Sequence, residues 1–379
     1  MTAPALIAFA SKIAPTYTGG LAAYQRSLIA AIANLGHTPC SLYENERFPD
    51  SRLGYEAMPW TSHRLRRTVS GYLGRNILPT LSTRTPQIAA FLAERRLNIP
   101  DTMRPSAIHI TGTGWDHTGF AMAKWARELD VPFSIWPAVH PGQWGDSPID
   151  MLLYGLADVV FCQSSGERDD LIKLGLDPQK TRLCGLPPFC RPDGQGDRLR
   201  KHLEIEDRPV VLFLGRRDKG KGYPALIEAW RIVLERQSEA VLMLAGPGNA
   251  LRPGQLPENS YRDLGLLDEK TKADAYAACD IFCLPSAHES FGIVFVEAWS
   301  YGKPVVCGPA PASRELIEDG ETGLWSTQDP AVLADKLITL LESPTLAKTM
   351  GNAGKQLQQE SYTTERMVRS HLQAWQLVA

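Results

Sequence analysis

The sequence predicts an α/β fold built from two Rossmann-like domains. Short apolar runs with the length of buried strands alternate with helical segments along most of the 379 residues. A proline- and glycine-rich stretch at 185–196 interrupts this alternation, which then starts again. We therefore expect an N-terminal domain at 1–190 and a C-terminal domain at 191–360. Glycine-rich turns in both halves imply a deep ligand-binding cleft between the domains.

The overall composition excludes several functional classes. Hydrophobic residues make up 44% of the chain and charged residues 22%, which is typical of a globular protein. The formal net charge is −2, so the overall electrostatics argue against a nucleic-acid partner. No stretch has the length of a transmembrane helix and the N-terminus lacks a signal-peptide pattern, so we expect a cytoplasmic protein.

The seven cysteines predict neither disulfides nor a metal centre. Their number is odd and most lie in apolar, strand-like segments, a pattern typical of reduced, buried thiols. Cys279 and Cys283 are close in sequence, but no second pair with zinc spacing follows them. We therefore expect no metal ion and no cofactor.

The N-terminal half reads as alternating strands and helices, with two places where a ligand could approach. The first is Gly19-Gly20, which joins a strand at 5–10 to a helix at 21–35. Such a pair is often only a turn, but it also lets backbone approach a ligand closely. The second is His140, which follows a strand at 131–137, at the sheet edge where these folds bind ligands. His109 lies within the strand at 106–111, and we expect it to be structural.

A basic segment occupies 60–84. Its arginines are interleaved with apolar residues, and no carboxylate occurs between 57 and 93. Such a stretch can bind anionic lipid or an anionic acceptor, which would place the protein at the inner face of the membrane. The alternative is a solvated helix–loop surface.

The C-terminal half opens with a second ligand-type turn. A strand at 209–214 leads into the basic, glycine-rich turn 215–223, and a helix follows at 224–236. A helix N-terminus combined with cations favours a phosphate-bearing ligand. The alternative is a solvated basic turn. Later strands are expected at 240–245 and 261–264, and Asp268 is expected to cap a helix that runs to Cys279.

The stretch 281–307 is the most informative part of the chain. It reads as a strand at 281–284, a break at Pro285-Ser286, a helix from about Phe291-Gly292, and a strand at 305–307. Glu289 precedes the helix, and two turns of helical spacing would bring Glu297 beneath its N-terminus. Two carboxylates beside an anion-seeking helix end favour a phosphate ester that carries hydroxyls on both sides.

The residues of this stretch resemble a known signature. Glu289-Ser-Phe-Gly-x4-Glu297-Ala, followed by Tyr-Gly-Lys-Pro-Val-Val, resembles the E-x7-E motif of the retaining glycosyltransferases of family GT4, which have the GT-B fold. The resemblance implies transfer of a hexose from a UDP- or GDP-sugar to a hydroxyl of a sugar, glycan or lipid-linked acceptor, with retention of configuration. No Asp-x-Asp metal motif is present. The alternative is an ordinary strand–helix unit with two surface glutamates.

The resemblance also implies roles for individual residues. Arg216 and Lys221 would neutralise the donor diphosphate, since Lys219 comes two residues too early for the family spacing. Glu289 would hold donor-sugar hydroxyls and Glu297 the ribose, while His140 would position the reacting groups. The remaining donor-binding positions implied are Gly19, Gly20, Leu266, Leu267, Ser290, Phe291, Gly292 and Ile293.

Two further expectations follow from the family. Its members send the last helix, here 361–379, back to the first domain, with Trp375 as one anchor. Their reactions include cell-surface polysaccharide and glycolipid assembly. The alternatives are a sucrose- or trehalose-type synthase, a related epimerase without transfer, and a non-catalytic subunit that binds a nucleotide-sugar.

Overall fold

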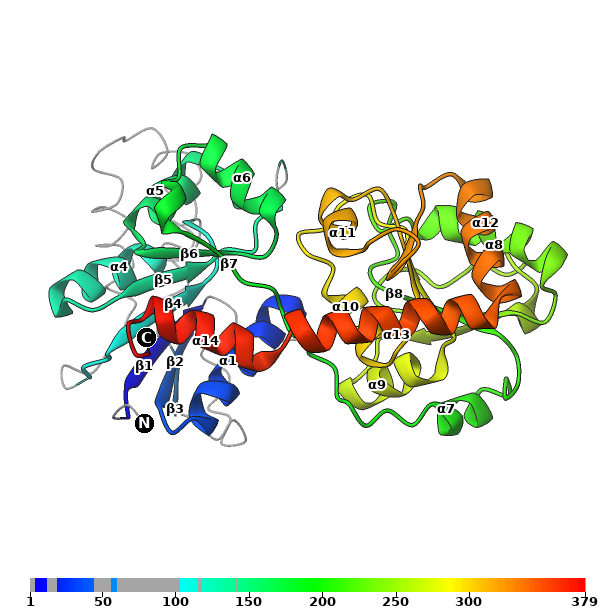
Figure 1. Cartoon of the computed structure of the whole chain (residues 1–379), viewed down its shortest axis with the longest axis horizontal. Helices are drawn as coiled ribbons and strands as arrows, with labels where there is room; N and C mark the ends of the chain where they lie inside the picture. Colours follow the sequence, from blue (N-terminus) through cyan, green and yellow to red (C-terminus); the bar gives the residue numbers. More distant parts are fainter. Residues whose placement is uncertain are drawn as a thin grey trace. The chain divides into compact units, whose positions relative to one another are not determined.

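The computed structural model describes residues 4–11, 19–43, 103–114, 118–140, 142 and 144–378, together with the backbone of 56–59. The basic segment at 60–84 lies outside these residues. Contacts divide the chain into two units, and Figure 1 shows that each is built around a sheet flanked by helices. Unit 1 is Met1–Gly185 with Thr364–Ala379, and unit 2 is Leu186–Thr363.

The sheet of unit 1 is parallel throughout the described residues, with strand order β3-β2-β1-β4-β5-β6-β7. This arrangement confirms the predicted Rossmann-like fold of the first half. The strands are β1 (Leu6–Ser11), β2 (Thr38–Tyr43), β3 (Glu56–Pro59), β4 (Ala107–Thr111), β5 (Phe133–Trp136), β6 (Val159–Cys162) and β7 (Thr181–Leu183).

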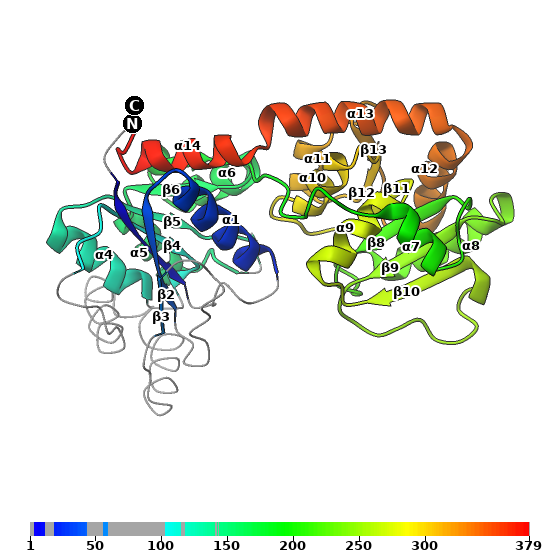
Figure 2. The same ribbon diagram turned by 90° about the horizontal axis from the view of Figure 1, so that it is seen from below.

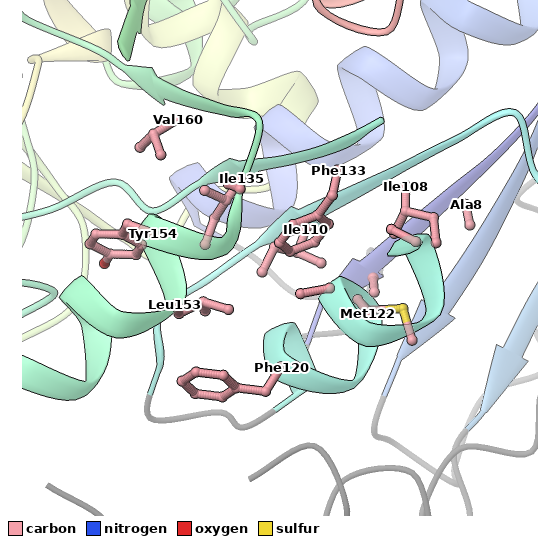
Figure 3. Close-up of a cluster of buried hydrophobic side chains, with 14 of the residues drawn as sticks. Ala8, Ile108, Ile110, Phe120, Met122, Phe133, Ile135, Leu153, Tyr154 and Val160 are labelled. Carbon is pink, nitrogen blue, oxygen red and sulfur yellow. The ribbon is translucent and has the colours of Figure 1, made fainter. Parts of the chain in front are cut away.

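The helices of unit 1 cover both faces of this sheet. On one face, α4 and α5 pack on the strands, and Figure 3 shows their cluster with Met122 of α4 beside Ile108 and Leu153 of α5 near Ile110. On the other face, α1 lies beside α14, as Figure 2 shows. The helices are α1 (Gly20–Asn34), α4 (Thr118–Leu129), α5 (Pro148–Leu156), α6 (Ser165–Lys173) and α14 (Thr364–Ala374), with a 3-10 turn at Pro178–Lys180.

A chain of buried hydrogen bonds fastens α14 to the sheet of unit 1. The indole N–H of Trp375 lies 2.7 Å from Ser134 Oγ, which lies 2.9 Å from His109 Nδ1. His109 Nε2 is 3.1 Å from the hydroxyl of Tyr24, and that hydroxyl is 2.6 Å from His371 Nε2. His109 is therefore structural, as the sequence predicted.

The two ends of this series of hydrogen bonds determine which atom donates in each bond. An indole N–H can only donate and a carbonyl can only accept, and His371 Nδ1 lies 2.7 Å from the Met367 carbonyl oxygen. The hydrogen bonds are all made when both His109 and His371 are neutral. Burial lowers the pKa of His371 to about 3, and burial and the neighbouring His371 lower the pKa of His109.

Unit 2 has the same architecture. Its parallel sheet has the order β10-β9-β8-β11-β12-β13. The strands are β8 (Val210–Leu214), β9 (Val241–Ala245), β10 (Tyr261–Gly265), β11 (Ile281–Leu284), β12 (Val305–Cys307) and β13 (Gly323–Trp325). The helices are α7 (Gly196–His202), α8 (Tyr223–Arg236), α9 (Glu269–Ala278), α10 (Ile293–Ser300), α11 (Pro311–Leu316), α12 (Pro330–Glu342) and α13 (Pro344–Ser361), with a 3-10 turn at Glu258–Ser260. The chain therefore contains two Rossmann-like domains, as predicted.

No helix among the described residues is long and apolar enough to span a membrane. The seven cysteines are all free thiols, six of them buried.

Candidate functional site

Two loops of unit 2 meet at one edge of its sheet. The strands β8 and β11 are parallel neighbours, so the loops that follow them leave from the same edge. The backbone N–H of Ala287 donates to the Gly220 carbonyl at 2.8 Å, and the Ser286 hydroxyl donates to it at 3.2 Å. Gly222 has φ +73°, and a Cβ there would lie 2.2 Å from the Pro285 carbonyl oxygen. Glycine at this position therefore lets the two loops close on each other.

The contact of these loops brings Lys221 and Glu289 together. Lys221 Nζ lies 2.5 Å from Glu289 Oε1, and the two side chains are 15% and 9% exposed. Lys221 Nζ is also 3.5 Å from the His288 carbonyl oxygen, and the Lys221 backbone N–H donates to Asp218 at 2.9 Å. The structure thus joins two of the predicted site residues in one largely buried ion pair.

The neighbouring arginines, Arg216 and Arg217, have different environments. Arg216 is 67% exposed, and its Nε lies 3.3 Å from Asp218 Oδ2. Arg217 is 2% exposed and forms a two-pronged ion pair with Asp263 of β10. This guanidinium holds the pKa of Asp263 below its usual range. Arg216 therefore remains accessible to a ligand, whereas Arg217 connects two strand ends.

The N-terminus of α10 borders the same loop. Gly292 precedes the helix with φ +90°, and within the described residues no side chain caps this end. Phe291 is 4% exposed and packs edge-on against Tyr362, which fixes the approach to the helix. Ser290 and Ile293 are partly exposed. Uncapped backbone N–H groups and the helix dipole make this end suited to an anion.

Glu297 lies about one turn into α10 and faces α9. It is not two turns beneath the helix end as expected, because the helix begins only at Ile293. Its carboxylate accepts from the Tyr276 hydroxyl at 2.8 Å and pairs with Lys272 Nζ at 3.1 Å. Burial opposes the charge of Lys272, but Glu297 and Glu269 outweigh it and raise the pKa of that lysine. The sequence contained no sign of these two partners.

The last predicted donor positions of unit 2 follow β10. Gly265 ends this strand with φ +60°, and the side chain of Leu266 is 76% exposed. Leu267 is partly buried and precedes Asp268, whose carboxylate caps α9 through the Thr271 N–H at 2.6 Å. An exposed leucine directly after a parallel strand leaves an apolar surface at the ligand-binding edge.

In unit 1, the predicted residues lie at the ends of β1 and β5. Gly19 is the N-cap of α1 with φ +122°, and both Gly19 and Gly20 are exposed, with no atom near a Cβ built at either position. The loop before Gly19 lies outside the described residues. His140 is partly exposed beyond the carboxyl end of β5.

His140 belongs to a small backbone bridge with Trp144. The His140 N–H donates to the Trp144 carbonyl at 3.1 Å, and the Trp144 N–H donates back at 3.0 Å. The two rings are stacked, with centroids 5.5 Å apart and planes inclined by 27°. Trp144 is not among the site residues that the sequence predicted. A tryptophan four residues after a histidine at a strand end was the available signal.

Two buried carboxylates, those of Glu167 and Asp150, accept hydrogen bonds from the backbone at this edge of unit 1. Glu167 accepts from the N–H groups of Val139 at 2.7 Å and Gln163 at 2.6 Å, which tie the ends of β5 and β6 together. Burial raises the pKa of Glu167 to about 7, although these backbone donors oppose the rise. Asp150 accepts from Gly114 N–H at 2.7 Å and from the Ser147 hydroxyl at 2.6 Å.

Neither unit gathers a metal-binding cluster within its described residues, where no group of three or more His, Cys, Asp or Glu side chains could hold an ion. Cations for a phosphate-bearing ligand are instead available from Lys221 and Arg216.

Comparison with protein-family models finds two matches along the chain. Residues 19–187 match the glycosyl transferase 4-like domain, and residues 195–357 match the glycosyl transferases group 1 family.

Two relatives match part of the chain. A phosphatidyl-myo-inositol mannosyltransferase of Mycobacterium leprae is 40% identical over 152 residues, which are 38% of this chain and 40% of the relative. A D-inositol 3-phosphate glycosyltransferase of Corynebacterium efficiens is 34% identical over 217 residues, covering 52% of this chain and 51% of the relative. The match thus spans two fifths to about half of the length of these relatives.

Solved structures match the whole chain. HepE of Anabaena, in complex with UDP and glucose, superposes with a TM-score of 0.71 at 18% identity and covers 99% of this chain and 100% of that one. A sucrose-phosphate synthase of Thermosynechococcus elongatus gives a TM-score of 0.74 at 19% identity, covering 98% of both chains. These likenesses establish the GT-B fold.

Proposed function

The chain belongs to the group 1 glycosyl transferases, with a glycosyl transferase 4-like first half, and from this premise we propose that it is a retaining hexosyltransferase. It would move a sugar from a UDP- or GDP-sugar to a hydroxyl acceptor. The observation that carries the proposal is the Lys221–Glu289 pair beside the uncapped end of α10. A cation, a carboxylate and free backbone donors at one sheet edge match the phosphates and hydroxyls of a nucleotide-sugar.

The donor would be held in parts by different groups. Lys221, Arg216 and the N-terminus of α10 would neutralise the diphosphate, and their fixed charge would stabilise it as it departs. Glu289 would accept hydrogen bonds from the sugar hydroxyls. Glu297, oriented by its bonds to α9, would accept from the ribose through its small exposed surface.

The other predicted positions would complete the donor site. Leu266 and Leu267 would pack against the base, and Ser290, Phe291, Gly292 and Ile293 would supply backbone to the phosphates. Gly19 and Gly20 are proposed to leave the N-terminus of α1 open to a donor phosphate.

The transfer itself would need no covalent intermediate on a side chain. The donor sugar–oxygen bond breaks and its electron pair leaves with the diphosphate. The acceptor oxygen bonds to the anomeric carbon on the same face, and a donor phosphate oxygen takes the acceptor proton. His140 would position these groups. The proposal includes no metal ion, because cationic side chains and the helix dipole take that role.

The acceptor is the less defined partner. The names of the two relatives contain inositol compounds, so inositol phosphate and phosphatidylinositol belong among the candidate acceptors, as do the sugars of cell-surface polysaccharides and glycolipids. A sucrose- or trehalose-type synthase with a soluble acceptor is the second candidate function. The likeness to sucrose-phosphate synthase concerns the fold alone and does not favour it.

Nucleotide release tests the proposal. The chain is incubated with UDP- and GDP-sugars and a panel of acceptors, and release of UDP or GDP is followed with the wild type and Glu289→Ala. We expect acceptor-dependent release from one donor class, a loss of at least about a hundredfold in the variant, and retained nucleotide binding. Product anomers read by NMR should keep the donor configuration. Nucleotide binding without release from any donor would instead indicate a non-catalytic binding subunit.

A further inference from the structure

Trp144 is the most exposed tryptophan in the described part of the chain. It is 37% exposed, whereas Trp125 and Trp325 are partly buried and Trp136, Trp230, Trp299 and Trp375 are at most 2% exposed. Burying the apolar surface of an indole under a ligand or partner lowers the free energy, because that surface is removed from water. Its position at the ligand-binding edge of the unit 1 sheet favours a ligand.

The segment that carries Trp144 is held in place by bonds that do not involve the indole. Two backbone hydrogen bonds join Trp144 to His140, and the Gly145 carbonyl accepts from the buried Tyr154 hydroxyl at 2.8 Å. Beneath it, Glu167 anchors Val139. The backbone that carries the indole is therefore held in place before any ligand arrives.

An imidazole lies beside the exposed indole. The His140 ring stacks against one side of it. Asp146, two residues further along the chain, is partly exposed and accepts the Gly142 N–H at 2.6 Å. An aromatic face beside an imidazole matches a ligand that is apolar on one face and carries hydroxyls around its rim. Pyranose and cyclitol rings have this character, because their axial C–H bonds form an apolar face.

We propose that Trp144 is the stacking platform for the acceptor ring and selects cyclic polyols, pyranoses or cyclitols, over open-chain hydroxyl compounds. The inference rests on the proposed function, since it assigns an acceptor class to that reaction. His140 would meet the ring hydroxyls at its edge. Stacking would keep the attacking hydroxyl in one plane, so Trp144 would act on acceptor affinity more than on the chemical step.

The test uses the full chain, its Trp144→Ala and Trp144→Phe variants, and Leu35→Ala as the matched control. Leu35 is also an exposed apolar residue of unit 1, at 58%, but it follows α1 at the opposite edge of the sheet. The probes are methyl α-mannoside, methyl β-glucoside, methyl β-galactoside, myo-inositol and inositol 1-phosphate, with sorbitol as the ring-free comparison. Saturation-transfer NMR reports which probe protons contact the protein and how tightly.

The expected result is saturation of ring C–H protons by the wild type and by Leu35→Ala. Trp144→Ala should weaken the affinity about tenfold, and Trp144→Phe about threefold at most, because an aromatic face remains. Acceptor KM should rise in Trp144→Ala while kcat changes little. Equal binding by Trp144→Ala and wild type, no binding of any ring probe by the wild type, or equal binding of sorbitol would overturn the inference.

UDP and GDP binding is measured on the same samples by calorimetry. If a nucleotide binds equally to all variants while the ring affinity does not depend on Trp144, only the acceptor inference fails. If neither nucleotide binds the wild type, the proposed function fails whatever the sugars do.

Discussion

Lys221 Nζ lies 2.5 Å from Glu289 Oε1, although the two residues are 68 positions apart in the sequence. The pair exists because β8 and β11 are neighbours and because Gly222 lets their following loops touch. A carboxylate beside the lysine holds the cation in place, and a bound diphosphate would share that cation. The relationship makes Lys221 the residue on which donor binding should depend most.

Replacing Lys221 by alanine should weaken binding of the cognate nucleoside diphosphate about ten- to a hundredfold, the usual worth of a hydrogen bond between charged groups. The loss also leaves Glu289 without its cation and near the phosphates. Lys219→Ala is the matched control, since Lys219 is exposed in the same turn and should change affinity by about twofold at most. Calorimetry measures the nucleotide affinity of both variants. Equal losses of affinity would mean that the turn attracts the nucleotide only through its overall positive charge.

Variants of the two adjacent arginines should affect different properties, nucleotide binding for Arg216 and stability for Arg217. Arg217→Ala removes a 2%-exposed guanidinium from Asp263 and should destabilise unit 2 by about 3 kcal/mol. Arg216→Ala, at 67% exposure, should change stability by less than about 0.5 kcal/mol but weaken nucleotide binding. Urea unfolding and calorimetry on both variants test this. A stable Arg217→Ala protein that binds nucleotide poorly would reverse the assignment.

Closure of the two loops should depend on glycine at 222. Gly222→Ala must accept φ +73° and a Cβ 2.2 Å from the Pro285 carbonyl oxygen, so both stability and nucleotide affinity should fall. Gly320→Ala isolates the first effect, because Gly320 has φ +81° but no atom within 4 Å of the added Cβ. We expect about 1 kcal/mol for Gly320→Ala and clearly more for Gly222→Ala in urea unfolding. Similar losses in the two variants, with unchanged affinity, would show that the loops need not close.

Docking of α14 on unit 1 should weaken at acid pH. His109 and His371 are neutral when buried, and both would take a proton once released, near pH 6.5. The pKa values of both histidines are lower in the folded state. The neutral rings therefore stabilise the docked helix fully above pH 6.5, and this stabilisation is lost as the pH falls towards the pKa values of the folded state. For His371 the loss is on the order of 2 kcal/mol at pH 5.

Hydrogen exchange of the α14 amides, corrected for the intrinsic pH dependence, measures this effect. His371→Phe keeps the stacking on Phe161 but cannot titrate, so protection should be lower at pH 8 and should depend less on pH. His202→Ala, an exposed histidine on α7, should leave the pH dependence unchanged. A wild-type α14 whose protection is the same at pH 8 and pH 5 would contradict the hydrogen-bond directions inferred for Tyr24 and its neighbours.

Much of the fold could be predicted because its longer elements carry a periodic signal. The strands at 281–284 and 305–307 and the Asp268 cap lie where the sequence placed them. The elements that were missed are short. The helices α7 and α11 have 7 and 6 residues, and β3 and β13 have 4 and 3, too few for a period to emerge.

Candidate site residues could be proposed from the sequence where local spacing singles them out, but the contacts they make with distant segments could not. The spacing to Glu297 and to Lys221 could be read from single segments. The bonds of Glu297 to Lys272 and Tyr276, and of Arg217 to Asp263, depend on how separate segments pack. Exposure, which distinguishes Trp144 from the buried tryptophans, is likewise a property of the assembled fold.

The most direct test of the account is a thermal-shift comparison of UDP, GDP, ADP and CMP with their sugar conjugates. A ligand at a hundred times its Kd should add about 2.7 kcal/mol to stability, or about 5 to 10 °C for a unit of this size. We expect a shift with UDP or GDP and its sugar conjugate, and its loss in Lys221→Ala. No shift with any nucleotide in a folded sample would contradict it.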